Sequence, residues 1–365
     1  MTENIQEKIK NIIARYSQAD DREVVAQLKQ LLYEFELQDC LEKEPKSIAD
    51  LVAENIQQLN KESHQNAVVK SGLEGFDRQF GGFHLGEFVV VGGRPGMGKT
   101  QLLINLSLNI SATVPVLYVT LDLSEFLLTN RFISSVSDIP INNILLNNLG
   151  VEEKHILSKI GDEFAKRKLF IHDSVSTSIT ALKTHCQKQI KKNGIQVIVV
   201  DYLQIINFHK HRTHRELEVS YICRELKNMA KEHNVCVIAS SQLNRSVETR
   251  GVTSKRPQLF DLRDSGAIEQ EADKVLFIYR PDYYRLDFED GTPGVGLADI
   301  IVAKNRNGFL GECRLRFCNN FRDLFLDSAT PSSQINEISF ASSREALVFA
   351  SKRLAELDGI GNVPF

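Results

Sequence analysis

The sequence contains Gly93-Arg94-Pro95-Gly96-Met97-Gly98-Lys99-Thr100, a complete G-x-x-x-x-G-K-[ST] pattern. Residues 88–91 before it are apolar, and residues 101–108 after it favour a helix. Glycines let successive backbone N–H groups curl around a β-phosphate, and the following helix directs the positive end of its dipole at the anion. The stretch therefore predicts a strand, a phosphate loop and a helix that bind a nucleoside triphosphate, rather than a glycine-rich turn without a ligand.

Two side chains of this loop have separate chemical tasks. Lys99 can reach the β- and γ-phosphates, and the Thr100 hydroxyl can hold Mg²⁺. We expect the cofactors to be a nucleoside triphosphate, which the family resemblance given below implies is ATP, and Mg²⁺. The expected nucleotide site comprises Gly93, Arg94, Pro95, Gly96, Met97, Gly98, Lys99, Thr100 and Gln101.

Strand-like runs alternate with helical ones after residue 86. The strand-like runs cover residues 88–91, 116–121, 169–172, 197–201, 235–239, 275–279 and 299–303. Such alternation is typical of a mainly parallel sheet with helices on both faces. The sequence therefore predicts an α/β fold with a central, mainly parallel sheet flanked by helices.

The composition is that of an ordinary globular chain and excludes few functions. The 365 residues are 42% hydrophobic and 25% charged, with a formal net charge of -3. This near-neutral balance does not predict a nucleic-acid partner, so binding of that kind requires a local basic cluster. The six cysteines form no C-x-x-C pair, and no apolar run reaches the length of a membrane span. We therefore expect reduced thiols, no membrane partner and a cytoplasmic protein.

The sequence pattern changes near residue 65, which we interpret as a domain boundary. Residues 1–65 are expected to form a helical N-terminal segment and a linker helix, because residues 23–41 and 47–59 carry apolar side chains at helical spacing. Residues 66–327 hold the phosphate loop and the alternating strands, and form the expected ATPase domain. Residues 328–365 are expected to be a linker followed by a short helical tail.

Two carboxylates follow strand-like runs, at the edge where a parallel sheet presents its ligand. Asp201 ends the run Q-V-I-V-V-D and is placed to support the Mg²⁺ of a phosphate-loop enzyme. Asp122 follows the run at residues 116–121 and could orient or deprotonate an attacking water. It could equally cap a helix that starts near Glu125, and position alone does not separate the two interpretations.

Four segments, in this order, resemble the motor domain of DnaB-type replicative helicases. They are G-G-R-P-G-M-G-K-T at residues 92–100, V-D-Y-L-Q at 200–204, S-Q-L-N-R-S-V-E at 241–248 and D-L-R-D-S-G-A-I-E-Q at 261–270. The likeness extends from about residue 72 to residue 326. It implies a RecA-like P-loop NTPase fold, a homo-oligomeric ring that is expected to be hexameric, and ATP-driven translocation on single-stranded DNA.

The resemblance also implies roles for individual residues of the nucleotide site. Lys99 and Thr100 would hold phosphates and Mg²⁺, Asp201 would support the metal, and Gln242 would sense the γ-phosphate and relay its state.

The expected catalytic position departs from the family. The family motif resembles S-L-E-M-S, with glutamate as the base, whereas residues 120–124 read T-L-D-L-S and place Asp122 there. Aspartate is one methylene shorter, and catalysis is sensitive to a misplacement of about 1 Å. We therefore expect hydrolysis to be slow, or to be helped by Glu125 or by a shifted backbone.

Residues 303–308, A-K-N-R-N-G, are similar to the family hairpin that reaches the ATP site of a neighbouring subunit. The resemblance makes Arg306 the arginine finger and Lys304 its companion. A guanidinium stays protonated and offers several N–H donors in a fixed fork, which suits charge developing on a γ-phosphate. Without the resemblance, the same residues would be interpreted as a solvated basic strand end.

Two locally basic segments are candidates for contacts with DNA phosphates, and solvated surface loops are the alternative interpretation. The residues expected to bind DNA are Lys210, Arg212 and Arg215 in the first segment, and Arg245, Arg250, Lys255 and Arg256 in the second. Such contacts are independent of base sequence and sensitive to salt, as a translocating motor requires. His209, His211 and His214 also suggest a metal cluster, but no nearby Cys or carboxylate set completes it.

The leading hypothesis is an ATP-dependent DNA helicase of the DnaB type, a ring that hydrolyses ATP to translocate on single-stranded DNA and separate duplex strands. The alternative is a non-unwinding RecA-like ATPase that acts as a switch or loader in recombination, repair or a mobile element. Asp122 and an N-terminal region shorter than the family's favour this alternative. A primase or a loader protein is a candidate partner. An interaction protein with little turnover is less favoured, because Gln242, Lys304 and Arg306 are all in place.

Overall fold

The computed structural model describes residues 46–59, 68–137, 139–174, 177–208, 215–250, 255–262, 265–317 and 326–327. Contacts divide the chain into two units, residues 1–64 and 65–365. The helix expected at residues 23–41 and the linker and tail expected at residues 328–365 lie outside the described residues. No helix in the described ranges is long and apolar enough to cross a membrane.

The first unit contributes one described helix, α3 (Ile48–Leu59), which confirms the helix expected at residues 47–59. The Ser47 hydroxyl accepts the backbone N–H of Asp50 at 3.1 Å and so caps the helix start. Its apolar side chains recur at helical spacing and are exposed: Ile48, Leu51, Val52 and Ile56. The helix therefore carries an apolar stripe of the kind that packs against another surface.

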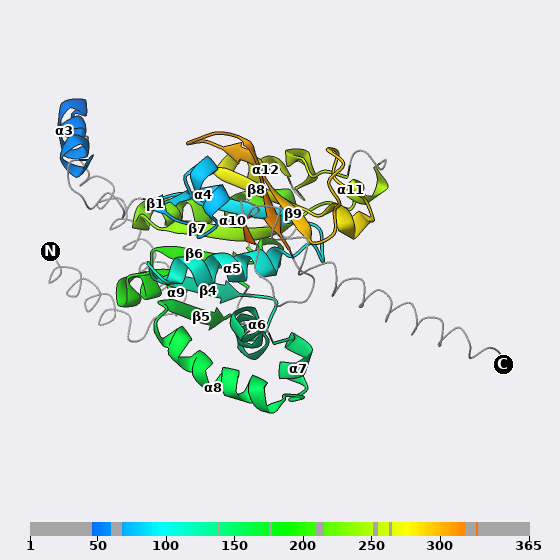
Figure 1. Cartoon of the computed structure of the whole chain (residues 1–365). Coiled ribbons are helices and arrows are strands. Elements are labelled where there is room, and N and C mark those ends of the chain that lie inside the picture. The colour runs from blue at the N-terminus through cyan, green and yellow to red at the C-terminus, as the bar shows by residue number, and fades with distance from the viewer. Residues whose placement is uncertain are drawn as a thin grey trace, which may run out of the picture. The chain divides into compact units, whose positions relative to one another are not determined.

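The second unit is built on a nine-stranded sheet, in the order β11-β10-β9-β8-β3-β7-β6-β4-β5 among the described residues. The strands are β3 (Phe88–Gly93), β4 (Val116–Thr120), β5 (Leu169–Asp173), β6 (Val197–Asp201), β7 (Cys236–Gln242), β8 (Lys274–Tyr279), β9 (Leu297–Asn305), β10 (Gly311–Arg316) and β11 (Leu326–Asp327). The six strands from β8 to β5 are parallel, and β9, β10 and β11 join antiparallel. Figure 1 shows β7, β6, β4 and β5 following one another across the sheet.

The strands alternate the direction of their side chains, so the sheet buries apolar groups on both faces. On β3, Val89 and Val91 join one core cluster, whereas Phe88 and Val90 join the other. Residues of α4 (Glu74–Phe80), α5 (Lys99–Ser111) and α6 (Glu125–Ser137) belong to the first cluster. Residues of α9 (Ile179–Asn193), α10 (Arg215–His233) and α12 (Ser265–Glu271) belong to the second. The expected α/β fold, with helices on both faces of a mainly parallel sheet, is confirmed.

The remaining described elements are short or lie at the periphery of the sheet. They are α7 (Ile141–Leu145), α8 (Val151–Ala165), α11 (Ser246–Thr249), the 3₁₀ turns Leu203–Ile205, Leu259–Asp261 and Pro281–Tyr284, and a separate antiparallel pair, β1 (Val68–Val69) with β2 (Phe83–His84).

The antiparallel edge of the sheet differs from the sequence-based expectation. The strand expected at residues 299–303 is the longer β9, and β10 was not predicted at all. On β10 only Cys313 and Leu315 are buried, and they alternate with the charged residues Glu312, Arg314 and Arg316. A strand near the edge of a sheet buries one face only, so its apolar signal is half that of a central strand.

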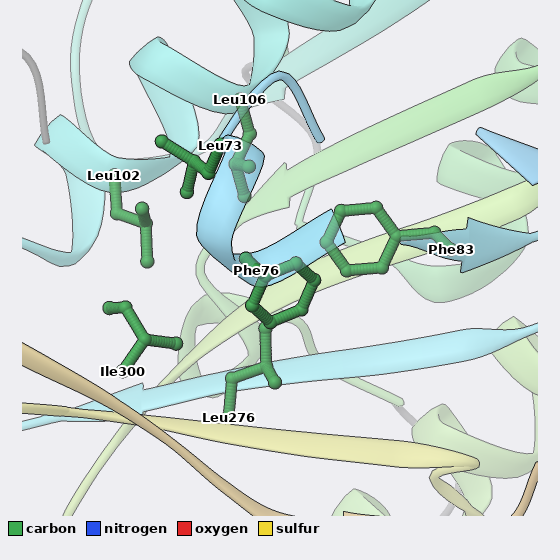
Figure 2. A pocket seen from close by; sticks show the side chains of 7 residues that line it. All are labelled: Leu73, Phe76, Phe83, Leu102, Leu106, Leu276 and Ile300. Carbon is green, nitrogen blue, oxygen red and sulfur yellow. The ribbon is translucent and has the colours of Figure 1, made fainter. Parts of the chain in front are cut away.

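A small apolar cavity of about 10 Å³ lies between α4, α5 and the sheet. Figure 2 shows the seven side chains that line it: Leu73, Phe76, Phe83, Leu102, Leu106, Leu276 and Ile300. The rings of Phe76 and Phe83 lie 5.6 Å apart, centroid to centroid. Because no polar side chain lines this space, it is a packing void of the core rather than a ligand site.

We predict that Phe76→Ala will lower the free energy of unfolding by about 3–5 kcal/mol, because Phe76 is 1% exposed and its removal enlarges an existing void. Denaturant unfolding of the purified protein would measure the change. Phe126→Ala is a matched control, since that ring is 69% exposed and its loss should cost less than about 0.5 kcal/mol. Equal losses in the two variants would contradict this account of the core.

Candidate nucleotide site

The glycine-rich loop connects β3 to α5, as the sequence predicts. Gly96 and Gly98 have φ angles of 79° and 99°, a backbone region that side chains with a Cβ rarely adopt. A Cβ on Gly96 would also lie 3.3 Å from the ring of Tyr283. The loop therefore needs glycine at both positions to keep its backbone N–H groups open towards an anion.

Lys99 lies over the loop and contacts only backbone oxygens in the described structure. Its Nζ donates to the carbonyls of Gly93 at 2.8 Å and Arg94 at 3.2 Å. Burial lowers the pKa of Lys99 to about 8, although the nearby Asp201 carboxylate acts in the opposite direction. An ammonium group that is desolvated and bound only to neutral carbonyls is well prepared to exchange them for phosphate oxygens.

Asp201 is surrounded by three hydroxyl groups at the end of β6. Thr100 Oγ1 donates to its Oδ2 at 2.7 Å, Tyr118 Oη donates to the same oxygen at 3.1 Å, and Ser240 Oγ donates to its Oδ1. Burial, and then the Asp201 charge, raise the pKa of Tyr118 well above its usual value, so the phenol remains a donor. The cluster joins the expected phosphate and metal residues, and its oxygen-only donors suit a hard cation such as Mg²⁺.

Asp122 lies in the turn between β4 and α6 and is exposed. The described bonds that cap α6 come from other residues: Ser124 Oγ accepts the N–H of Leu127 at 3.3 Å, and Asp173 Oδ2 accepts the N–H of Glu125 at 3.0 Å. Ser124 and Asp173, rather than Asp122, therefore cap this helix. The Asp122 carboxylate remains exposed at the carboxyl edge of the sheet.

The same turn is tied to β6, the strand that ends in Asp201. The N–H of Leu121 donates to the carbonyl of Asp201 at 3.0 Å, and Thr120 Oγ1 donates to the carbonyl of Leu123 at 2.7 Å. The position of Asp122 is thus set by its neighbours on both sides.

Gln242 ends β7, directly beside Gly93 at the start of the loop, where the two residues are register partners. Its backbone is held by Gln204, whose Oε1 accepts the Gln242 N–H at 3.2 Å and whose Nε2 donates to Ser241 Oγ at 2.8 Å. Sequence reasoning assigned no role to Gln204, although it stands in the motif that contains Asp201. Its position links the end of β6 to the end of β7.

Two residues of the expected nucleotide set have side chains committed elsewhere. Arg94 is 7% exposed, and it donates to Glu248 on α11 and to the carbonyl of Leu243 at 2.8 Å. Gln101 is buried, and its Nε2 donates to Asn105 at 3.1 Å and to Ser135 at 3.0 Å. These two side chains therefore brace the loop and its helix, so a contact of either residue with nucleotide would have to use the backbone.

Lys304 and Arg306 lie at the opposite edge of the sheet from the loop. The N–H of Arg306 donates to the carbonyl of Asp273 at 2.9 Å, and Asp273 in turn accepts the N–H of Phe88, the first residue of β3. Lys304 Nζ donates to the carbonyl of Glu269 on α12. The loop follows the last residue of β3, and a strand rises about 3.3 Å per residue. The guanidinium is thus separated from the loop of its own chain by the length of that strand.

Part of the expected DNA-binding set is engaged in contacts within the chain. Arg250 pairs with Asp261 and Arg256 with Asp299 and Glu312, whereas Arg215 pairs with Glu218 and Lys255 donates to the carbonyl of Glu248. Arg245 is exposed.

Lys210, Arg212 and the three histidines of the metal alternative lie outside the described residues. Within the described ranges, no group of three or more His, Cys, Asp or Glu could hold a metal.

The family model for the DnaB-like helicase C-terminal domain matches residues 68–325. The chain belongs to this family. The replicative DNA helicase DnaB of Rickettsia conorii is 33% identical over 350 residues, which cover 87% of this chain and 70% of the relative. That of Haemophilus influenzae is 36% identical over 282 residues, which cover 75% of this chain and 59% of the relative.

Solved structures agree with the family assignment. A DnaB-like replicative helicase, solved in a study of its interactions with primase, has a TM-score of 0.72 at 28% identity and covers 88% of this chain and 76% of that one. A solved ATPase domain has a TM-score of 0.71 at 30% identity and covers 78% of this chain and 99% of that one. The RecA-like fold, nucleotide binding and membership of the ATP-driven DNA helicases follow, and the comparisons do not favour the non-unwinding alternative.

We predict that nucleotide affinity will fall as the pH rises above about 8. Bound phosphates favour the charged form of Lys99, so binding raises its pKa, and the affinity is complete below the pKa of the free protein and lost above it. The expected loss approaches about tenfold per pH unit. Titration of a fluorescent nucleotide between pH 7 and pH 9 would measure it.

Lys99→Arg is the control, because a guanidinium does not titrate in this range. A variant that still binds nucleotide should show a nearly flat profile. An equally flat profile in the unsubstituted protein would contradict the assigned pKa.

Proposed function

We propose that this chain binds ATP with Mg²⁺ and hydrolyses the ATP to move along single-stranded DNA and separate duplex strands. The observation that carries the proposal is the contact between Thr100 and Asp201, 2.7 Å between hydroxyl and carboxylate, at the start of the helix that follows the phosphate loop. This pair provides the oxygen ligands, direct or through water, that Mg²⁺ prefers. A bound ion would neutralise charge that develops on the phosphate oxygens.

The chain's own residues would carry the hydrolytic step. Lys99 would leave the carbonyls of Gly93 and Arg94 and donate to the β- and γ-phosphates. Asp122, exposed at the same edge, would orient the attacking water or accept its proton. Gln242, at the end of the strand beside the loop, would contact the γ-phosphate, and Gln204 would fix its backbone.

An arginine finger supplied by a neighbouring copy of the chain would complete the site. An extended six-residue strand such as β3 spans roughly 17–20 Å, which exceeds the reach of an arginine side chain. Arg306, with Lys304 beside it, would therefore serve the phosphate loop of the next subunit. Contacts of this kind run head to tail and close into a ring, which we propose is a hexamer.

The first unit supports assembly independently of the finger. The exposed stripe of α3 (Ile48, Leu51, Val52 and Ile56) would be covered by packing against a neighbouring subunit, as expected for a linker helix.

We also propose that the ring holds single-stranded DNA through lysine and arginine contacts with phosphates. Arg245 is the candidate that is exposed and needs to break no described ion pair, whereas Arg215, Arg250, Lys255 and Arg256 would first have to leave their present partners. Lys210 and Arg212 remain candidates from the sequence. A primase or a loader protein is a proposed partner, by analogy with the DnaB-like helicase solved in a study of its interactions with primase.

Mixing two inactive variants tests the shared site. Lys99→Ala removes the phosphate ligand and Arg306→Ala removes the finger, so each variant alone should lose ATP hydrolysis by at least about a hundredfold. In an equal mixture, about one quarter of head-to-tail interfaces would combine an intact loop with an intact finger. We therefore predict that mixing will restore DNA-stimulated hydrolysis, measured as phosphate release. A mixture as inactive as its components would contradict a finger acting between subunits.

We predict that Asp122→Glu will raise the kcat for ATP hydrolysis, because the longer side chain brings the carboxylate nearer the attacking water, where about 1 Å is worth up to about a hundredfold in rate. Steady-state hydrolysis with single-stranded DNA would measure kcat. Asp122→Asn is the matched control, which keeps the size of aspartate but cannot accept the proton, and it should lose activity. Unchanged hydrolysis in Asp122→Asn would remove Asp122 from the mechanism.

A further inference from the structure

Asp273 lies immediately before β8 and is 5% exposed. Its Oδ2 accepts the backbone N–H of Phe88 at 2.8 Å and Lys227 Nζ at 2.6 Å. Its Oδ1 accepts Arg306 Nη1 at 3.2 Å. The two oxygens of one buried carboxylate thus have different partners. Oδ2 joins β3 to α10, and Oδ1 holds the guanidinium at the end of β9.

The Arg306 side chain is fixed by hydrogen bonds although it is not buried. Its Nη2 donates to the carbonyl of Gln270 on α12, and the side chain is 45% exposed. A guanidinium has five N–H donors in one plane, so the contacts with Asp273 and Gln270 leave others available for a phosphate. Those two contacts also restrict the rotation of an otherwise flexible side chain, which is the condition for delivering it to a reaction at low entropic cost.

The turn that carries Arg306 has a second attachment. Asn307 Nδ2 donates to Glu87 Oε1 at 2.9 Å, and Glu87 is 3% exposed at the start of β3. Glu87 and Asp273 lie immediately before the neighbouring strands β3 and β8, at the same edge of the sheet. The turn is therefore tied by its backbone to the residue before β8, and by Asn307 to the residue before β3, the strand that leads to the phosphate loop.

We propose that Asp273 is a positioning residue for the reaction: its Oδ1 sets the orientation in which the Arg306 guanidinium is presented to the ATP site of the neighbouring subunit. This inference rests on the proposed role of Arg306 as a finger. Asp273 itself would touch neither nucleotide nor metal. Its role would account for the two oxygens having different partners, since Oδ2 binds groups within the fold and Oδ1 binds the partly exposed Arg306.

Asp273→Asn in the full chain tests the proposal. The amide can turn its oxygen to the N–H of Phe88 and its nitrogen to Arg306, so it keeps the bond within the fold and loses the attraction to the finger. We expect kcat for DNA-stimulated ATP hydrolysis to fall by about 10- to 100-fold while KM for ATP changes less than about twofold. Adding Arg306→Ala to this variant should give the rate of Arg306→Ala alone, because both act on one group.

Lys227→Gln is the matched control, because it removes a partner from Oδ2 and leaves the contact between Oδ1 and Arg306. It should keep kcat within about twofold. Where Asp273→Asn alone does not fold, the double variant Asp273→Asn/Lys227→Gln leaves no buried charge unpaired, and it is compared with Lys227→Gln. Thermal unfolding checks that each variant is folded.

Two results would overturn the inference while leaving the finger in place: an unchanged kcat in a folded Asp273→Asn variant when Arg306→Ala is inactive, or an equal loss in Lys227→Gln. Full activity in Arg306→Ala would instead remove the finger itself, and with it both the proposed shared site and the role of Asp273.

Discussion

The hydrogen bond between Thr100 and Asp201 is the contact on which the rest of the site depends. It joins the first turn of α5 to the end of β6, although β7 lies between β6 and β3 in the sheet. The carboxylate can do this because Ser240 on β7 and Tyr118 on β4 donate to it from the strands on either side. Parallel strands bring all of these carboxyl ends to one edge. A buried carboxylate with three hydroxyl donors is satisfied without a metal and is already in place for one.

The opposite edge of the sheet imposes the second constraint. β9 runs antiparallel to β8, so its end, with Lys304 and Arg306, lies where β3 begins rather than where the loop follows it. The phosphate loop and Arg306 are thereby kept apart within one chain. If Arg306 acts as the proposed finger, this antiparallel edge would make catalysis depend on a neighbouring subunit. Asp273 contacts Arg306 and the first residue of β3, and Glu87 contacts Asn307, so each subunit would present the two proposed half-sites at opposite ends of one strand.

The fold and the centre of the site could be predicted from the sequence because their signals are local. The loop backbone needs positive φ angles at positions 96 and 98, so the glycines at these positions mark it in the sequence. Strands that are buried on both faces, such as β6, appear in the sequence as continuous apolar runs. The helix-cap question at Asp122 could not be settled, because the capping oxygen of Asp173 comes from β5, 48 residues away from Glu125.

Partners distant in sequence account for the other misses. The role of Gln204 depends on Ser241 and Gln242, on a neighbouring strand, and β10 carries only half of the apolar signal of a central strand. In the second basic segment, the sequence indicated that Arg250 and Arg256 could bind DNA phosphates. In the structure both are paired with carboxylates from elsewhere in the chain. For Gln204, Arg250 and Arg256, the sequence gives the residue type but does not identify the residue that it contacts.

Unwinding of a forked DNA duplex by the purified chain tests the central claim most directly, with a labelled strand whose release is followed in time. The account predicts strand release that requires Mg²⁺ and ATP and stops when a non-hydrolysable analogue replaces ATP. Hydrolysis of ATP stimulated by single-stranded DNA, without any strand release from forks that offer either a 5′ or a 3′ tail, would contradict it and would select a RecA-like ATPase that does not unwind.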